Sequence, residues 1–205
     1  GVVIEEINMY EDSPEDLVHD LFSQAVWSGN PLGMSILGTE ESLGNLNRDT
    51  IVRYFKENYG PQNIVISVVG NFKHKDAVNR IKAYFEKAEQ IDKSAADIVM
   101  PRFEPEYTLK NKDTEQVHLC MGFNGVDIKS NTFYPMLVLN NVFGGAMSSR
   151  LFQKIREDRG LAYSVFSYPS SFEDCGLFSI YAGSKPDNLK SVAELIMEEI
   201  NLIKN

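Results

Sequence analysis

Apolar residues recur at helical spacing in several separate stretches of the chain. The last stretch, 186–203, has a continuous apolar stripe, which predicts a long amphipathic helix. The stripe consists of Leu189, Val192, Leu195, Ile196, Ile200 and Ile203. The same spacing predicts further helices at residues 2–11, 14–25, 39–46, 48–59, 75–88, 133–143 and 149–157. The helix at 14–25 has a clear start, because Ser13 can cap it and Pro14 suits its first turn.

Four other stretches have the pattern of β-strands. Residues 64–71, IVISVVGN, form a continuous β-branched run, which predicts a strand with little exposed surface. Residues 114–123, 163–168 and 176–181 are interpreted as three more strands, the last two on either side of a turn at Glu173-Asp174. The order of these elements predicts the α+β class, with helices packed on one face of a largely antiparallel sheet.

The pattern breaks once, near the middle of the chain. Residues 89–106 lose periodicity, and the strand pattern restarts at Thr114. We therefore predict two lobes, the first at 1–93 and the second at 107–205, joined by a linker at 94–106. The first predicted helix begins at residue 2 and the last ends with the chain, so we expect both lobes to be incomplete in this chain.

Composition narrows the classes of protein. The formal net charge is −9 and the pI is about 4.9, and such a field repels a phosphate backbone, which argues against nucleic-acid binding. No apolar run approaches the roughly 20 residues that span a bilayer, and the start has no signal-peptide pattern. Cys120 and Cys175 form no metal or disulfide pattern, so we expect half-buried thiols in a reducing compartment, the cytoplasm.

The residues that could do chemistry do not form a familiar site by themselves. His19, His74 and His118 are far apart, and neither HExxH nor HxxEH occurs, so we interpret them as surface or hydrogen-bonded structural histidines. GxSxG and the glycine-rich phosphate loops are also absent. A zinc site built from this chain alone is therefore not expected.

Several separated blocks nevertheless carry a resemblance that runs over essentially the whole chain. These are VVIEEINMYEDSPEDLVHDLF, NPLGMSILGTEESL, NYGPQNIVISVVGN, TEQVHLCMGF and FGGAMSSRLFQKIREDRGLAYSVFSY. Together they resemble the pitrilysin-like M16 zinc metallopeptidases, which include insulin-degrading enzymes and mitochondrial processing peptidases. The bacterial processing-protease branch looks most similar. The resemblance implies two α+β lobes that enclose a chamber.

The resemblance implies a zinc site to which this chain contributes one ligand. Family members bind Zn²⁺ through an HxxEH motif and a distant glutamate on a later helix. The register matches Glu6 to that glutamate, with Glu5 as the alternative. The HxxEH motif, which also supplies the general base, would precede Gly1. A carboxylate is a suitable third ligand for a catalytic zinc that keeps a position open for water.

The resemblance also implies two catalytic residues in the second lobe. Arg156 and Tyr163 have the spacing of an arginine and a tyrosine that, in active family members, reach from the second lobe to the zinc site. They hold the substrate backbone and the developing oxyanion, roles that suit a charged donor and an O–H group. Arg159 is a competitor for the role of Arg156.

Three functions follow from this reasoning. The first is a zinc-dependent metalloendopeptidase, a processing protease that cleaves peptides or unstructured segments, with this chain alone inactive. The second is a non-catalytic partner or peptide-binding subunit of the same fold, which the residues before Gly1 would distinguish. The third is an α+β binding module unrelated to peptidases. The expected partner is a peptide substrate, with a homodimer as one form of assembly, and neither nucleic acid nor membrane.

Overall fold

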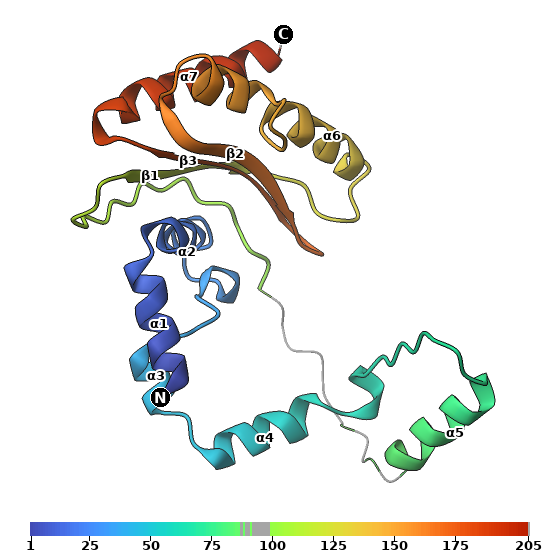
Figure 1. Cartoon of the computed structure of the whole chain (residues 1–205). Coiled ribbons are helices and arrows are strands. Elements are labelled where there is room, and N and C mark those ends of the chain that lie inside the picture. The colour runs from blue at the N-terminus through green and yellow to red at the C-terminus, as the bar shows by residue number, and fades with distance from the viewer. Residues whose placement is uncertain (87, 89–90, 92–98, 205) are drawn as a thin grey trace. The chain divides into compact units, whose positions relative to one another are not determined.

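The computed structural model of the chain describes residues 1–86, 88, 91 and 99–204 (Figure 1). It divides into two compact units, one made of Gly1–Thr39 with Val99–Asn205 and the other of Glu40–Ile98. Helices together with an antiparallel sheet confirm the predicted α+β class. The lobe boundaries inferred from the sequence stay a prediction, and residues 94–98 of the predicted linker lie outside the described residues.

The first unit is built on a three-stranded antiparallel sheet in the order β1-β3-β2. Its strands are β1 (Val117–Asn124), β2 (Ala162–Ser171) and β3 (Gly176–Ser184). The central strand β3 is buried along its whole length because it has a partner on each side. Successive side chains of a strand point to opposite faces, so this strand needs apolar or hydrogen-bonded residues on both.

Helices cover one face of this sheet (Figure 1). They are α6 (Phe133–Phe143), the π-helix at Phe152–Glu157 and α7 (Leu189–Ile203). Their buried apolar residues form one core with this face of the sheet. It includes Phe143, Leu151, Ile155, Val165, Phe178, Ile180, Val192 and Ile196. Each such side chain contributes about 1.5–3 kcal/mol on burial, so the sheet and its helices hold the later half of the chain firmly.

Helix α2 (Pro14–Val26) covers the opposite face of the same sheet, in addition to the helices predicted for one face. The predicted cap is confirmed, because the Ser13 side chain accepts a hydrogen bond from the backbone N–H of Asp16. The ring of Phe22 lies so close to Gly122 that a Cβ at residue 122 would overlap it. Farther along, Val26 and Trp27 are buried with Leu177 in a second apolar cluster. Helix α1 (Val2–Asp12) precedes α2 and packs against it.

The second unit contains three helices among its described residues: α3 (Glu40–Gly44), α4 (Arg48–Asn58) and α5 (His74–Phe85). The strand predicted at 64–71 is wrong for this structure, since no described strand pairs with the segment. Val65 and Val69 are each 96% exposed. A β-strand satisfies its backbone N–H and C=O groups through a neighbouring strand, so a β-branched run alone does not form one.

The remaining regular elements are short 3-10 helices. They lie at Pro31–Gly33, Pro61–Asn63 and Pro186–Asn188, each with proline in its first turn. Proline is favoured at that position because its N–H would be unpaired anyway. Among the described residues, no helix has both the length and the apolar content needed to cross a membrane.

Candidate functional site

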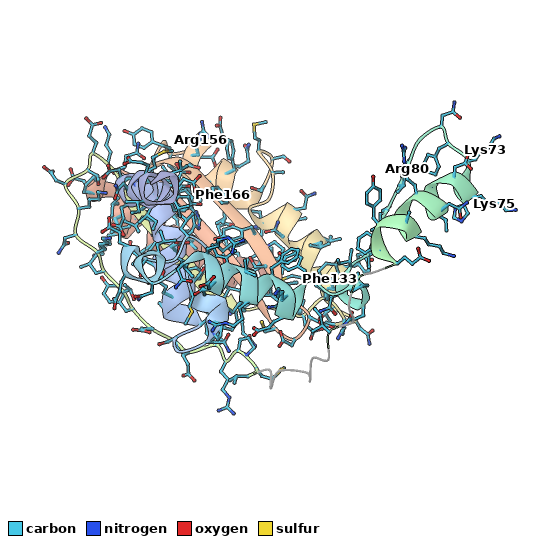
Figure 2. All side chains as sticks on the ribbon, turned by 90° about the horizontal axis from the view of Figure 1, so that it is seen from below. Lys73, Lys75, Arg80, Phe133, Arg156 and Phe166 are labelled. Atoms are coloured by element: carbon cyan, nitrogen blue, oxygen red, sulfur yellow. The ribbon has the colours of Figure 1, made fainter. Side chains whose placement is uncertain are left out.

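Arg156 lies in an unusual piece of helix. The turn is a π-helix, in which the N–H of Asp158 donates to the Gln153 carbonyl, 2.8 Å away and five residues back. π-helical turns are rare and occur frequently at functional sites. Arg156 is exposed (Figure 2), and its guanidinium lies 4.9 Å from the centre of the Phe152 ring. The ring therefore supports a cation that remains available to a ligand.

Tyr163 lies in a β-bulge at the start of β2. Ala162 pairs with Ser184 and Ser164 with Gly183, so consecutive residues of β3 oppose residues two apart in β2. Tyr163 is the extra residue, and its ring is 51% exposed. Bulges re-aim a side chain and are enriched beside active sites. The tyrosine therefore presents its O–H to the surroundings from a fixed backbone position.

A short, well-anchored turn joins these two residues. The N–H of Gly160 donates to the Arg156 carbonyl at 2.9 Å, and Gly160 has a φ of +61°, a conformation that glycine adopts readily. The N–H of Leu161 donates to the Ile155 carbonyl at 3.0 Å. The Asn188 side-chain amide then donates to the Leu161 carbonyl at 3.1 Å, which ties the turn to the start of α7.

The structure thus brings Arg156 and Tyr163 into one rigid unit, although no hydrogen bond between their side chains is found in the described part of the chain. Arg159 is exposed in the turn itself. It borders a hollow of about 360 Å³ whose other wall is formed by Ser191, Glu194, Leu195 and Glu198 of α7. Arg159 therefore faces an acidic helix, whereas Arg156 is supported by an aromatic ring.

An ion pair that no sequence pattern indicated anchors the residues just before the π-helix. Arg150 Nε donates to Glu199 Oε2 at 2.8 Å, and the Glu199 side chain is only 5% exposed. The pair joins the turn before the π-helix to α7. No motif marks it, because the two residues are far apart in sequence and each fits an ordinary helix.

Replacing Glu199 by glutamine is expected to destabilise the protein by about 1–2 kcal/mol, measured by chemical denaturation. The expected loss is smaller than the about 3–5 kcal/mol for fully buried pairs, because Arg150 remains in partial contact with water and can be hydrated. The matched control is Glu194→Gln, whose 3.9 Å pair with Lys190 is exposed. It should cost at most about 0.5 kcal/mol. Equal losses for both variants would contradict a structural role of the buried pair.

Glu6, the predicted zinc ligand, lies on the exposed surface of α1, and so does its alternative Glu5. Ion pairs hold the end of this helix, since Lys110 Nζ lies 2.7 Å from Glu11 and Lys112 Nζ lies 3.5 Å from Asp12. Within residues 1–86, 88, 91 and 99–204, no three His, Cys, Asp or Glu side chains lie together in a way that could hold a metal ion. The described residues could therefore supply a zinc ion with one carboxylate ligand, that of Glu6 or Glu5, but not with a complete site.

The histidines and cysteines have structural surroundings, as predicted. His74 is exposed at the start of α5, whereas His19 and His118 are half-buried and each bonds a tyrosine hydroxyl. Burial raises the pKa of the Cys120 thiol to about 12 and that of Cys175 to about 11, so both thiols are protonated near neutral pH. Cys175 lies between the bend at 173–174 and Gly176, the first residue of β3.

Comparison with known proteins gives consistent results. A family profile described as "Peptidase M16 inactive domain" matches residues 45–205. The chain is 46% identical over 204 residues to the uncharacterized zinc protease YmxG of Bacillus subtilis, covering 100% of this chain and 49% of that protein. It is 40% identical to the uncharacterized zinc protease SCO5738 of Streptomyces coelicolor, covering 98% and 45%. The chain thus spans about half the length of the curated relatives it matches.

Solved structures share the fold. The crystal structure of a peptidase M16 inactive domain from Pseudomonas fluorescens matches with a TM-score of 0.85 at 21% identity, over 97% of this chain and 48% of that chain. A protease from Helicobacter pylori matches with a TM-score of 0.80 at 20% identity, over 96% and 50%. At this level of identity the likeness concerns the fold and not the activity.

Proposed function

Because the chain belongs to the M16 peptidase family and includes its inactive-type domain, we propose that it is part of a zinc-dependent metalloendopeptidase. In this proposal the full-length enzyme is about twice as long as the chain, as in its curated relatives. It cleaves peptides or unstructured segments in a chamber between two lobes, with a homodimer as one form of assembly. Membership of the M16 family excludes the third function considered above, an α+β binding module unrelated to peptidases.

The observation that carries the proposal is the pair of backbone irregularities beneath Arg156 and Tyr163. A π-helix and a β-bulge stand at the two ends of one anchored turn, and each presents one of the two residues to solvent. Irregular backbone is seldom retained without a use, because it gives up regular hydrogen bonds. Both residue types suit the stabilisation of negative charge on an oxygen atom.

Each residue has a distinct role in the proposed mechanism. Tyr163 donates its O–H to the carbonyl oxygen that gains charge when the peptide bond is attacked. Arg156, held against Phe152, donates charged N–H groups to the substrate backbone and keeps it oriented before and during that step. The backbone that carries both groups is anchored by the hydrogen bonds of the turn, which favours their positioning before the reaction.

Glu6 has a supporting role in the same proposal. Its carboxylate would be one ligand of a zinc ion whose other ligands come from outside the described residues. Zinc, when bound, supplies an activated water molecule and polarises the carbonyl group. Glu6 would also offset part of the positive charge of the metal.

Replacing Arg156 by alanine in the full-length enzyme tests the proposal. KM should rise and kcat should fall, because an anchor of the substrate backbone acts in the bound state and in the transition state. Zinc content should stay unchanged, since Arg156 is not a ligand. The measurement is steady-state hydrolysis of a quenched-fluorescence peptide. Arg159→Ala is the matched control, and a larger effect of Arg159→Ala would transfer the role to Arg159.

A second candidate function is a non-catalytic partner subunit of the same fold. The matching family profile is itself described as an inactive domain. Such a subunit would bind peptides without cleaving them. A full-length protein that binds the test peptide, contains no zinc and does not hydrolyse the peptide would favour this second function.

A further inference from the structure

The interface between α2 and the sheet contains two histidines, each bonded to a tyrosine of another element. His19 Nδ1 of α2 lies 2.8 Å from the hydroxyl of Tyr168 on β2. His118 Nδ1 of β1 lies 2.8 Å from the hydroxyl of Tyr181 on β3. The thiol of Cys120 lies 3.5 Å from His19 Nδ1. One polar cluster therefore joins α2 to all three strands.

The imidazole of His19 is also packed as an aromatic ring. Its centroid lies 5.1 Å from that of Tyr181 and 6.4 Å from that of Phe166, the latter in a stacked arrangement. Phe166 and Tyr181 in turn contact each other at 4.9 Å. A neutral imidazole suits such an environment, whereas an imidazolium loses hydration there. A neutral His19 therefore suits the docking of α2 on the sheet better than a charged one.

Charged groups around the two histidines favour their protonated forms, but burial has the larger effect and favours the neutral forms. On α2, Glu15, Asp16 and Asp20 raise the pKa of His19, and Glu15 also raises that of His118. Burial is the larger influence and lowers the pKa of both histidines, and the nearby charge of His118 lowers that of His19 further. Among the described residues, no Lys or Arg is found to influence the pKa of either histidine.

The other titratable groups of the cluster stay neutral across the physiological range. Burial raises the pKa of the Tyr168 and Tyr181 hydroxyls on β2 and β3. The thiol of Cys120 on β1 is also protonated, with a pKa of about 12. Near neutral pH, only His19 and His118 change charge within this interface.

We propose that the contact of α2 with the sheet is a pH-sensitive latch, closed while His19 and His118 are neutral and opened when they take up protons. The sign follows from proton linkage. In the closed form, His19 and His118 bind protons less readily than in the open form, where both histidines have the ordinary pKa near 6.5. Closing is therefore fully favoured above about pH 6.5. As the pH falls below about 6.5, each histidine lowers the equilibrium constant for closing by up to about tenfold per pH unit.

An open latch would have a consequence for catalysis, which rests on the proposed function. Helix α1, which carries Glu6, continues into α2 through Ser13 and packs against it. Release of α2 would therefore free Glu6 from the unit that carries Arg156 and Tyr163. The latch itself needs no peptidase activity and is tested without it.

The only tryptophan of the chain reports on the latch directly. Trp27 follows the last residue of α2 and is 3% exposed, packed with Leu177, Phe103 and their neighbours. As the 205-residue chain is titrated from about pH 8 to about pH 5, a range that spans histidine protonation, Trp27 emission should shift to the red. The rate of backbone hydrogen exchange in peptides from α2, relative to that in peptides from α7, should rise by up to about 100-fold at one pH unit below 6.5.

Variants identify the groups responsible. The double variant His19→Gln, His118→Gln retains hydrogen-bonding groups but cannot take up a proton, so the transition should disappear. His74→Gln, a change at an exposed histidine of α5, should leave the midpoint unchanged. An unchanged transition in the double variant, or no transition in the original chain, would overturn the proposal.

A second measurement serves if the double variant does not fold. The titration of the imidazole protons of His19 and His118 is followed by NMR in the original chain. The midpoints should coincide with the change in Trp27 emission. Imidazoles that titrate at a different pH from the tryptophan signal would overturn the latch.

Discussion

Replacing Tyr163 by phenylalanine in the full-length enzyme is expected to lower kcat by about 10²–10³, with a much smaller change in substrate affinity. This is the typical effect of losing one hydrogen-bond donor to an oxyanion, about 2.7–4 kcal/mol of barrier. The ring is retained, and its position in the bulge depends on the backbone pairing of Ala162 and Ser164, so the fold should not change. Steady-state kinetics on a quenched-fluorescence peptide provides the measurement.

Two controls accompany this variant. Metal analysis should give unchanged zinc content, since Tyr163 is not a predicted ligand. Tyr134→Phe removes a hydroxyl from a 75% exposed ring on α6 and should leave kcat as it was. A Tyr163→Phe enzyme with the original kcat, intact fold and intact zinc would show that the tyrosine is only a strand residue.

Replacing Glu6 by glutamine should reduce zinc affinity and activity together. A neutral amide is a poorer ligand than a carboxylate, and the site loses a negative charge. The loss of affinity should exceed the about 10–100-fold that follows removal of a hydrogen-bond partner of a ligand. The measurement is zinc content after dialysis against a weak chelator, with hydrolysis of the same peptide followed in parallel.

The neighbouring residue provides the matched control. Glu5 lies one position earlier on the same exposed helix, so Glu5→Gln makes the same change in charge and size. It should leave zinc and activity close to their original values. If Glu5→Gln abolished both while Glu6→Gln did not, the register of the predicted ligand would be wrong by one residue.

Much of the secondary structure could be predicted from local pattern. The helices predicted at 2–11, 14–25, 48–59 and 133–143 each end within one residue of the prediction, since apolar spacing and capping residues act within the helix itself. The strand at 64–71 could not be predicted in this way. Its formation depends on a partner strand, and the described residues provide none.

The candidate site was less accessible to sequence reasoning. The resemblance to the M16 family carried the prediction of Arg156 and Tyr163, but the π-helix and the bulge that present them depend on how the turn packs on the core. The pairs His19–Tyr168 and Arg150–Glu199 join residues distant in sequence, so no local pattern could reveal them. Gly122 gives a partial sequence signal for the contact between α2 and the sheet. A glycine inside a strand indicates that another group approaches closely, and here that group is the ring of Phe22.

The most direct test of the central claim is a comparison of zinc content between this chain and the full-length enzyme. The chain offers one predicted ligand, and a zinc site requires three protein ligands. We therefore expect no stoichiometric zinc and no peptide hydrolysis from the 205-residue chain. The full-length enzyme should hold one tightly bound zinc ion and cleave the peptide. Stoichiometric zinc in the chain alone, or a full-length protein that binds no zinc, would contradict the account.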